Sequence, residues 1–334
     1  MADVLDIRSP ATDHQKDNSH ARTAFLEAGG QPVLGDLPTP EVVPGHVLIK
    51  VRAAGLNPLD NVIAAGFMAE RFPHHYPLVL GRDAAGVVEA VGAGVDHVEP
   101  GQEAFGNVPL APPIQVGTLA EYALLPAETV VVKPAGLDFA TAAVMPLAAA
   151  AASAAVDLVE PQPGQVVLVN GASGGVGRYA VQLLAARSVT VVATGTSDDA
   201  ERLSELGATT VVNFAVGPVA DQVLAVHPDG VDALVNLVGF ALADVPLEAV
   251  RKGGRVATTT PAPDADALAG AGLAGGMVFA QPVRETAEPL AELAAAGLLS
   301  VDVHSVLPLE RAAEGLGVLA AGRARGKIVV TLGD

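Results

Sequence analysis

The sequence predicts an α/β protein in which a β-rich part precedes a doubly wound, mostly parallel sheet. Short apolar runs separated by glycine and proline begin at residue 22, which is the pattern of a β-rich domain. After residue 163 the runs are about five residues long and alternate with helical patterns, as the strands of a parallel sheet do. A glycine-rich turn, GASGGVG at 171–177, joins the first of these strands to the first helix.

In the β-rich part, the apolar runs at 46–55 and 84–95 predict strands. The proline-containing segments at 37–45 and 72–77 predict breaks between strands. Residues 1–21 contain acids, histidines and a lysine but no apolar block long enough for a secretory signal, so we expect a mobile N-terminal tail.

The second part alternates strands with helices from residue 166 to the end of the chain. Its expected strands are 166–170, 189–194, 210–214, 231–239 and 253–260, and its expected helices are 176–186 and 199–207. The segment 307–332 predicts one further helix and a last strand. The apolar segment 139–159 is mostly alanine and contains a proline and an aspartate, which favours a buried helix over a membrane span.

Composition narrows the class of protein. The chain has 334 residues, 19 of them basic and 37 acidic, and its formal net charge of -18 disfavours binding to nucleic acid or to an anionic membrane. It has no cysteine, which excludes disulfides, thiolate metal sites and a cysteine nucleophile. We therefore expect a cytoplasmic enzyme whose partner is a small molecule.

The glycine-rich turn predicts a nucleotide site. Glycines let the backbone approach a pyrophosphate, and the N-terminus of the following helix supplies N–H donors and a positive dipole end. The spacing Ala172-x-Gly174-x-x-Gly177 is the dinucleotide fingerprint with alanine in place of its first glycine. The expected binding residues are Gly171, Ala172, Ser173, Gly174, Gly175, Val176 and Gly177.

Five segments in order resemble the medium-chain dehydrogenase/reductase superfamily, in its zinc-free branch of quinone oxidoreductases and enoyl reductases. They are VRAAGLNPLDN, PLVLGRDAAGVVEAVGAGV, GTLAEYALLPAETVVVKPAGLDFATAAVMPLA, VLVNGASGGVGRYAVQLLA and RARGKIVVTL. The resemblance implies a GroES-like catalytic domain at 22–134 and 300–334, a Rossmann domain at 135–299 and an active site between the two. It also implies a homodimer formed through the Rossmann sheets.

The resemblance identifies candidate catalytic residues and an absent metal site. Zinc members carry a catalytic cysteine and a Gly-His-Glu element, where this chain has Asn57 and the triplet 81–83, Gly-Arg-Asp, so we expect no metal. Asn57 and Asp60 belong to the family motif, and Asp60 has the alternative role of capping the helix that follows it. His74 and His75 are candidate acids or bases, with a solvated loop pair as the alternative.

Two polar groups of similar reductases are missing. Such enzymes often place a tyrosine or lysine in the helix after the NPLD motif and a threonine near the nicotinamide, where this chain has the run 61–65, Asn-Val-Ile-Ala-Ala, and Ala151. A hydride can still be transferred when cofactor and activated alkene are held in contact. The alternative is a redox-silent enzyme of the same fold that catalyses a dehydration, elimination or cyclisation of a natural-product intermediate.

The end of the second strand of the parallel sheet bears on the choice of cofactor. Thr194, Gly195, Thr196 and Ser197 leave room for a 2′-phosphate, and Gly195 stands where an NAD enzyme would place its acid. Asp198, however, stands where relatives often have arginine, and its spacing to Glu201 predicts a capping box, with Arg202 as its ion-pair partner or as a ligand of the nucleotide. The pattern favours NADP(H), with NAD(H) or no cofactor as alternatives.

Further candidate cofactor contacts lie at other strand ends. They are Val238, Gly239, Thr259 and Lys327, the last in a closing motif where a basic residue of the family can reach the cofactor and where an ordinary turn before an edge strand is the alternative. Together these features predict a zinc-independent NAD(P)H-dependent reductase of the C=C bond of a quinone, enone or enoyl substrate, which would be small and apolar or conjugated.

Overall fold

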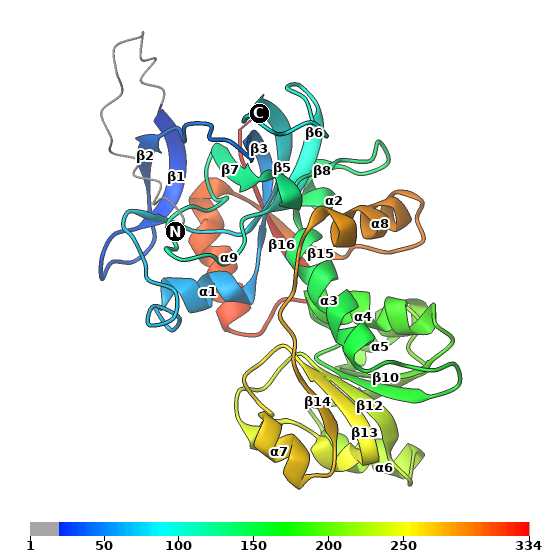
Figure 1. The fold of residues 1–334 in the computed structure, drawn as a ribbon. Coiled ribbons are helices and arrows are strands. Elements are labelled where there is room, and N and C mark those ends of the chain that lie inside the picture. Colours follow the sequence, from blue (N-terminus) through cyan, green and yellow to red (C-terminus); the bar gives the residue numbers. More distant parts are fainter. Residues whose placement is uncertain (1–19, 334) are drawn as a thin grey trace, which may run out of the picture. The chain divides into compact units, whose positions relative to one another are not determined.

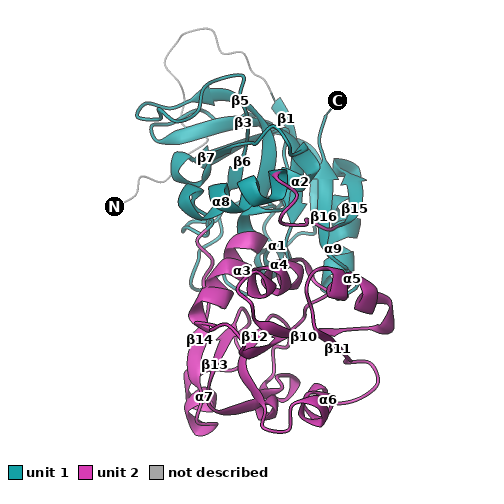
Figure 2. Cartoon of the chain, turned by 90° about the vertical axis from the view of Figure 1, so that its right-hand side faces the viewer, with its two compact units in different colours: residues 1–147, 282–295, 303–334 teal, residues 148–281, 296–302 magenta. Residues whose placement is uncertain are grey.

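The computed structural model describes residues 20–333, which divide into two units (Figure 2). Unit 1 contains the described residues up to 147 together with 282–295 and 303–333, and unit 2 contains 148–281 and 296–302. Residues 1–19 of the predicted tail lie outside the described residues. The last two residues of that predicted tail form the start of a strand, because β1 begins at His20.

Unit 1 is built on two sheets (Figure 1). The smaller sheet has the order β2 (Val33–Pro38), β1 (His20–Leu26), β4 (Leu78–Val79). The larger has the order β15 (Val303–Pro308), β16 (Lys327–Thr331), β3 (His46–Leu56), β5 (Asp83–Val91), β6 (Glu103–Asn107), β8 (Val131–Val132), and β7 (Tyr122–Pro126) also pairs with β3. The helices of unit 1 are α1 (Pro58–Ala64), α2 (Phe139–Ala143), α8 (Arg284–Ala295) and α9 (Ala312–Ala320).

Unit 2 contains the predicted parallel sheet. Its order is β11 (Thr210–Asn213), β10 (Thr190–Gly195), β9 (Val166–Asn170), β12 (Val231–Asn236), β13 (Val250–Thr258), β14 (Ala274–Met277), and every neighbouring pair is parallel. Its helices are α3 (Pro146–Leu158), α4 (Gly175–Ala185), α5 (Ala200–Glu205), α6 (Val219–Val226) and α7 (Ala265–Gly270). The chain builds outward from β9 in one direction and from β12 in the other, so the switch point of the sheet lies between these two strands.

Each unit has its own apolar core. In unit 1 the core includes Ile49, Leu56 and Ile328, which come from the adjacent strands β3 and β16. In unit 2 it includes Leu168 and Leu234 from β9 and β12. Burying one such side chain contributes about 1.5–3 kcal/mol, so the alternation of apolar runs along the sequence is what selects these strands. The predicted α/β fold is confirmed.

Two helices lie in a different unit from the one that the sequence predicted. α2 and α8 fall within 135–299, the predicted Rossmann domain, yet both belong to unit 1. α2 packs on β3 and β5, where a Cβ on Gly55 would stand 2.3 Å from the carbonyl oxygen of Ala143, and α8 packs on β8. These contacts, and not position along the chain, assign both helices to unit 1.

The alanine-rich segment 139–159 forms the two short helices α2 and α3. Among the residues that the structure describes, none of the helices has the length and apolar character needed to cross a bilayer.

Candidate functional site

The glycine-rich turn of unit 2 leads from β9 directly into α4. Gly171 has a φ of +88°, a conformation that a residue with a side chain rarely adopts. A Cβ on Gly177 would stand 2.3 Å from the carbonyl oxygen of Gly171 and 2.5 Å from the Cα of Ala172, so helix and turn approach each other at a distance that only glycine allows. Gly174 is the N-cap of α4, and its own Cβ would meet only the oxygen of Gly171, at 3.4 Å.

This geometry fits the pyrophosphate of a dinucleotide. The first N–H groups of a helix have no partner within the helix, and the N-terminus of α4 presents them next to Ser173 and Gly174 at the switch point of the sheet. The open space around the Cα of Gly174 leaves the backbone accessible to a phosphate oxygen. Residues 171–177 are therefore the part of unit 2 that would hold the cofactor.

Polar side chains connect the turn to the neighbouring strand ends. The backbone N–H of Gly171 donates to Oγ1 of Thr194 at 2.8 Å, and that hydroxyl donates to Oδ1 of Asn170 at 3.3 Å. Asn170 in turn donates to Asn236 at 2.9 Å, and Asn236 donates to Thr258 at 3.2 Å. Sequence reasoning missed both asparagines, although each closes a buried strand with the same Val-Asn ending.

Three further candidates follow β12 and β13. Val238 lies against the turn, because a Cβ on Gly171 would come within 2.7 Å of its Cγ1, and 45% of Val238 is exposed. Gly239 has a φ of +88°. The N–H of Thr259 donates to the carbonyl oxygen of Asn236 at 3.0 Å. The structure thus brings Gly171 and Val238 together, and Thr259 lies one strand further along the same edge of the sheet.

The end of β10 is capped differently from the expected pattern. The sequence predicted a capping box from Asp198 to Glu201, but the buried carboxylate of Asp199 accepts from both the N–H and the Oγ1 of Thr196, at 2.9 Å and 2.8 Å. The first turn after β10 is a 3-10 helix over 197–199, so the capping box runs from Thr196 to Asp199, two residues earlier than expected. A Cβ on Gly195 would stand 2.8 Å from Leu203 and 3.0 Å from the Cβ of Asp199, so the chain is closely packed there.

Arg202 is held by acids other than the expected Asp198. Its guanidinium donates to both oxygens of Asp302, at 2.9 Å and 2.6 Å, and to Glu205 at 2.9 Å. Arg178 on α4 donates to the same Asp302 carboxylate, and its Nε donates to the carbonyl oxygen of Ser173 at 2.9 Å. The Asp302 carboxylate therefore links α4 to α5 through Arg178 and Arg202, and Arg178 also links α4 to the glycine-rich turn. Asp302 lies in the last segment of unit 2, about a hundred residues from Arg202, and no sequence pattern pointed to it.

Unit 1 contains a separate buried polar cluster around Asn57, the N-cap of α1. The Asn57 amide donates to Oδ2 of Asp83 at 2.9 Å, and its Oδ1 accepts from Nζ of Lys327 at 2.5 Å. Lys327 also donates to the carbonyl oxygen of Leu56 at 3.0 Å, and Asn107 donates to Asp83 at 2.7 Å. Lys327 is only 5% exposed, and it is the first residue of β16, which has a strand on each side. The alternative that the sequence allowed, an ordinary turn before an edge strand, is therefore wrong.

Burial shifts the pKa values of the ionisable groups in this cluster. Asp60 is the third residue of α1, and its Oδ2 accepts from the N–H of Asn57 at 2.8 Å. Asp60 therefore takes part in the cap from within the first turn of the helix, and it is not a capping residue that precedes the helix. Its Oδ1 has no hydrogen-bond partner among the described residues, and burial raises the pKa of Asp60 to about 6 even though the nearby Arg82 acts to lower it. Burial also raises the pKa of Asp83 and lowers the pKa of Lys327.

The cluster does not suit a zinc ion. At the positions where zinc members of the family carry their ligands, this chain has Asn57 and Asp83, which hydrogen-bond each other, and Arg82, whose guanidinium donates to Val116 at 2.6 Å. Arg82 and Lys327 bring two cations into the space around Asp60 and Asp83. Among the described residues, His, Asp and Glu side chains form no group of three or more that could hold a metal.

The two candidate histidines lie on the loop before β4. His74 forms a bridge to Ile114, its Nε2 is buried without a partner among the described residues, and its ring stands edge-on to Tyr76 at 6.3 Å. Partial burial and Arg82 lower the pKa of His74, which favours the neutral ring. The His75 side chain is exposed. His74 is thus near the charge of Arg82, whereas His75 is exposed.

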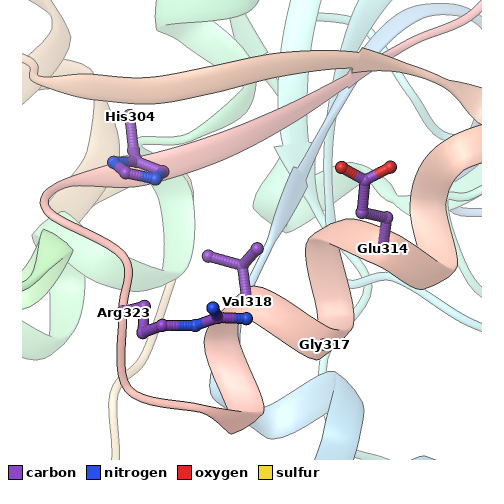
Figure 3. Close-up of a pocket in the computed structure, with 5 residues that line it drawn as sticks. All are labelled: His304, Glu314, Gly317, Val318 and Arg323. Atoms are coloured by element: carbon purple, nitrogen blue, oxygen red, sulfur yellow. The ribbon is translucent and has the colours of Figure 1, made fainter.

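A hollow of about 570 Å³ lies elsewhere in unit 1, between β15 and α9 (Figure 3). It is lined by His304, Glu314, Gly317, Val318 and Arg323. Arg323 belongs to the closing motif noted in the sequence, but none of the candidate catalytic or cofactor-binding residues lines this hollow.

The chain matches two family descriptions: "Alcohol dehydrogenase GroES-like domain" over residues 43–135 and "Zinc-binding dehydrogenase" over 206–330. It is 32% identical to the NADPH-dependent alkenal/one oxidoreductase of Arabidopsis thaliana, over 92% of this chain and 78% of that protein. It is 30% identical to the quinone oxidoreductase of Sus scrofa, over 91% of this chain and 95% of that protein.

A solved structure agrees with these sequence matches. The quinone oxidoreductase of Coxiella burnetii is 26% identical, with a TM-score of 0.85 over 94% of this chain and 100% of that one. The expected GroES-like and Rossmann folds are therefore both present. The chain belongs to the medium-chain dehydrogenase/reductase superfamily, alongside quinone and alkenal oxidoreductases.

Proposed function

We propose that this protein is a zinc-independent oxidoreductase that uses NAD(P)H to reduce the C=C bond of a quinone, enone or enoyl-type substrate. The observation that carries the proposal is the turn at 171–177, where Gly171 and Gly177 have a conformation and a close contact that few other residues could adopt. Support for the substrate class comes from the relatives, which are named alkenal/one oxidoreductase, 2-methylene-furan-3-one reductase and quinone oxidoreductase.

The chemistry needs little from titratable side chains. The bound nucleotide would supply a hydride to the β-carbon, and a proton from solvent would complete the reduction of the alkene. The polar cluster of Asn57, Asp83 and Lys327 is hydrogen-bonded within itself, and we propose that it shapes unit 1 near the substrate without carrying a metal. None of the described contacts favours the redox-silent alternative.

The finer assignments belong to the same proposal. We propose NADP(H) as the preferred nucleotide because Gly195 replaces the acid that would bind the ribose of NAD(H). A small apolar or conjugated substrate, a homodimer formed through the parallel sheets and a cytoplasmic location complete it. Relatives named as mitochondrial and chloroplastic proteins make the location a matter for direct measurement.

Nucleotide binding is the first test. Titration of the protein with NADPH and with NADH, followed by nucleotide fluorescence, should give saturable binding of at least one of them. Addition of an enone and quinone panel should then consume the nucleotide absorbance together with the substrate. Absence of binding by both nucleotides would overturn the proposal, and conversion of substrate without loss of nucleotide would favour the redox-silent enzyme.

Gly174→Ala separates the nucleotide site from the fold. The new methyl group meets only one protein atom, at 3.4 Å, so stability should change by less than about 0.5 kcal/mol. The same methyl group would occupy the approach of the phosphates, so nucleotide affinity should fall by about tenfold or more, which is about 1.4 kcal/mol. Gly270→Ala on α7, where a Cβ would meet nothing within 4 Å, is the matched control and should bind as the unmodified protein does.

A further inference from the structure

We propose that Asp302 sets the nucleotide preference of this protein by neutralising the two arginines next to the ribose end of the predicted site. The inference rests on the proposed function, since it concerns the same nucleotide. It assigns a specificity-determining role to a residue outside both the glycine-rich turn and β10. Removing the charge of Asp302 should increase the preference for a 2′-phosphorylated nucleotide.

The two arginines lie close to the glycine-rich turn and to the end of β10. Arg178 donates through Nε to the carbonyl oxygen of Ser173 in the turn, and its Nη2 lies 3.9 Å from Oδ1 of Asp199. Asp199 in turn packs beside Gly195, at the end of β10. Arg202 is on α5, the helix that follows that strand end. Both cations therefore belong to the region that lies between the turn and the end of β10, where the ribose of a bound dinucleotide is expected.

The carboxylate of Asp302 pairs with both arginines. Arg202 donates two parallel hydrogen bonds to the carboxylate of Asp302, and Arg178 donates to the same carboxylate. Forked arginine–carboxylate pairs of this kind are among the strongest ion pairs in proteins. Asp302 is partly buried, which acts to raise its pKa, but the hydrogen bonds from Arg202 and Arg178 hold that pKa below its ordinary value. The carboxylate is thus ionised throughout the neutral range and compensates the arginines there.

Asp302 is less exposed than the other acid that pairs with Arg202. Glu205 also accepts from Arg202, but its side chain is 56% exposed, whereas that of Asp302 is 17% exposed. Exposed ion pairs contribute little, so Asp302 dominates the compensation. The stretch 198–205 adds four acids against one arginine. With both arginines compensated, the region attracts a doubly charged 2′-phosphate less strongly than two uncompensated arginines would, which limits the preference for NADPH over NADH.

Asp302→Asn tests this directly. The amide keeps the shape and one acceptor oxygen while it removes the charge, so Arg202 and Arg178 become available to a phosphate. We would measure binding of two nucleotide fragments by calorimetry: 2′,5′-ADP, which carries the additional phosphate, and 5′-AMP, which does not. The ratio of the two affinities should shift by about tenfold in favour of 2′,5′-ADP, and the same shift should appear between NADPH and NADH.

Two further variants isolate the cause. Asp157→Asn removes an acid that pairs with Arg187 at 2.6 Å in unit 2, and it should leave the fragment ratio unchanged. Arg202→Gln combined with Asp302→Asn should remove most of the shift, because the released guanidinium is gone. A shift that persists in full in the double variant would overturn the role of Arg202, and an equal shift in Asp157→Asn would show a nonspecific charge effect.

The outcomes distinguish this inference from the proposed function. Nucleotides that bind with an unchanged ratio in Asp302→Asn would overturn the inference alone, whereas failure of NADPH, NADH and both fragments to bind the unmodified protein would overturn both. If Asp302→Asn does not fold, Arg202→Gln alone carries the test. The loss of Arg202 leaves the charge of Asp302 compensated by Arg178 alone, so binding of NADPH should weaken relative to NADH by about threefold or more, and an unchanged ratio would contradict the proposal.

Discussion

Unit 1 and unit 2 each contain a cluster of two cations with carboxylates, but the cations are hydrogen-bonded differently in the two clusters. In unit 1, Lys327 donates to a carbonyl and an amide oxygen and is 5% exposed. In unit 2, Arg202 donates directly to the carboxylate of Asp302, and its side chain is 34% exposed. A cluster that is closed to solvent and hydrogen-bonded to the backbone stabilises a fold, whereas one at a partly exposed strand end can respond to a ligand.

Lys327→Met should break the cluster of unit 1 and have the largest effect. The substitution leaves Asn57 Oδ1 and the Leu56 carbonyl without their donor and removes a positive charge next to Asp83. Removing one partner of a buried charge group costs about 3–5 kcal/mol, which denaturant unfolding would measure. Lys50→Met, at an exposed position on β3, is the control and should change stability by less than about 0.5 kcal/mol. A loss for Lys327→Met no larger than the control's would show that the cluster is not structural.

Asp60→Asn should change how the stability of the protein depends on pH. Burial raises the pKa of Asp60 from 3.8 to about 6, so the folded protein binds more protons than the unfolded chain between those values. The contribution of Asp60 to the unfolding free energy therefore falls as pH rises from about 4 to about 6, by about 3 kcal/mol, and is level above that.

Unfolding curves of Asp60→Asn and of the unmodified protein, recorded at several pH values, should show this pH dependence of the unfolding free energy. The stability of the variant relative to the unmodified protein should rise by about 3 kcal/mol between about pH 4 and pH 7. Asp36→Asn, on the exposed strand β2, should show no such trend. Parallel pH profiles for Asp60→Asn and the unmodified protein would mean that Asp60 is not perturbed by burial.

Gly177→Ala should disturb the backbone of unit 2 where the glycine-rich turn meets α4. Its methyl group would meet the backbone of Gly171 and Ala172 at 2.3 Å and 2.5 Å, and backbone atoms cannot yield as a side chain can. Thermal or denaturant unfolding should show a loss of about 1–3 kcal/mol, compared with the small change expected for Gly174→Ala. Equal stability of the two variants would contradict the close approach of turn and helix.

Asp198→Arg should have the smallest effect. Asp198 is exposed at the start of the 3-10 helix after β10, a position where the family resemblance implies a basic residue. Arginine at an exposed position should improve binding of NADPH relative to NADH by about fivefold at most, or about 1 kcal/mol, measured by competition titration at low and high salt. An effect larger than that of Asp302→Asn would place the control of nucleotide preference at Asp198.

The strands and helices that the sequence predicted are those with strong local patterns. β9, α4, β10 and β11 match the apolar runs and the glycine-rich turn that precedes the first helix. β14 was missed because its sequence, AGGM, contains two glycines and has little preference for a strand without its neighbour β13. α8 contains Pro289 and many polar residues, and only packing on β8 assigns it to unit 1.

The residues of the candidate site likewise divide into those set by local sequence and those set by long-range contacts. The turn at 171–177 was predictable because its constraint lies within seven residues, and Gly171 and Gly177 show that constraint. The burial of Lys327 depends on strands on both sides of β16, and the pairing of Arg202 with Asp302 joins residues about a hundred positions apart. Such contacts leave no periodic signal, so the pairing of Arg202 with Asp302 follows only from the structure. The cap of Thr196 by Asp199 is local, but the sequence offers two overlapping capping-box spacings, and only the structure shows which one forms.

The most direct test of the proposed reductase is a labelling experiment. The purified protein would be incubated with NADPH and, separately, NADH, each carrying deuterium on the transferable position of the nicotinamide, and with an enone. We expect one deuterium at the β-carbon of the saturated product, in equal amount to the nucleotide consumed. Product without deuterium at that carbon, or nucleotide binding without any reduction across a broad panel of enones and quinones, would contradict it.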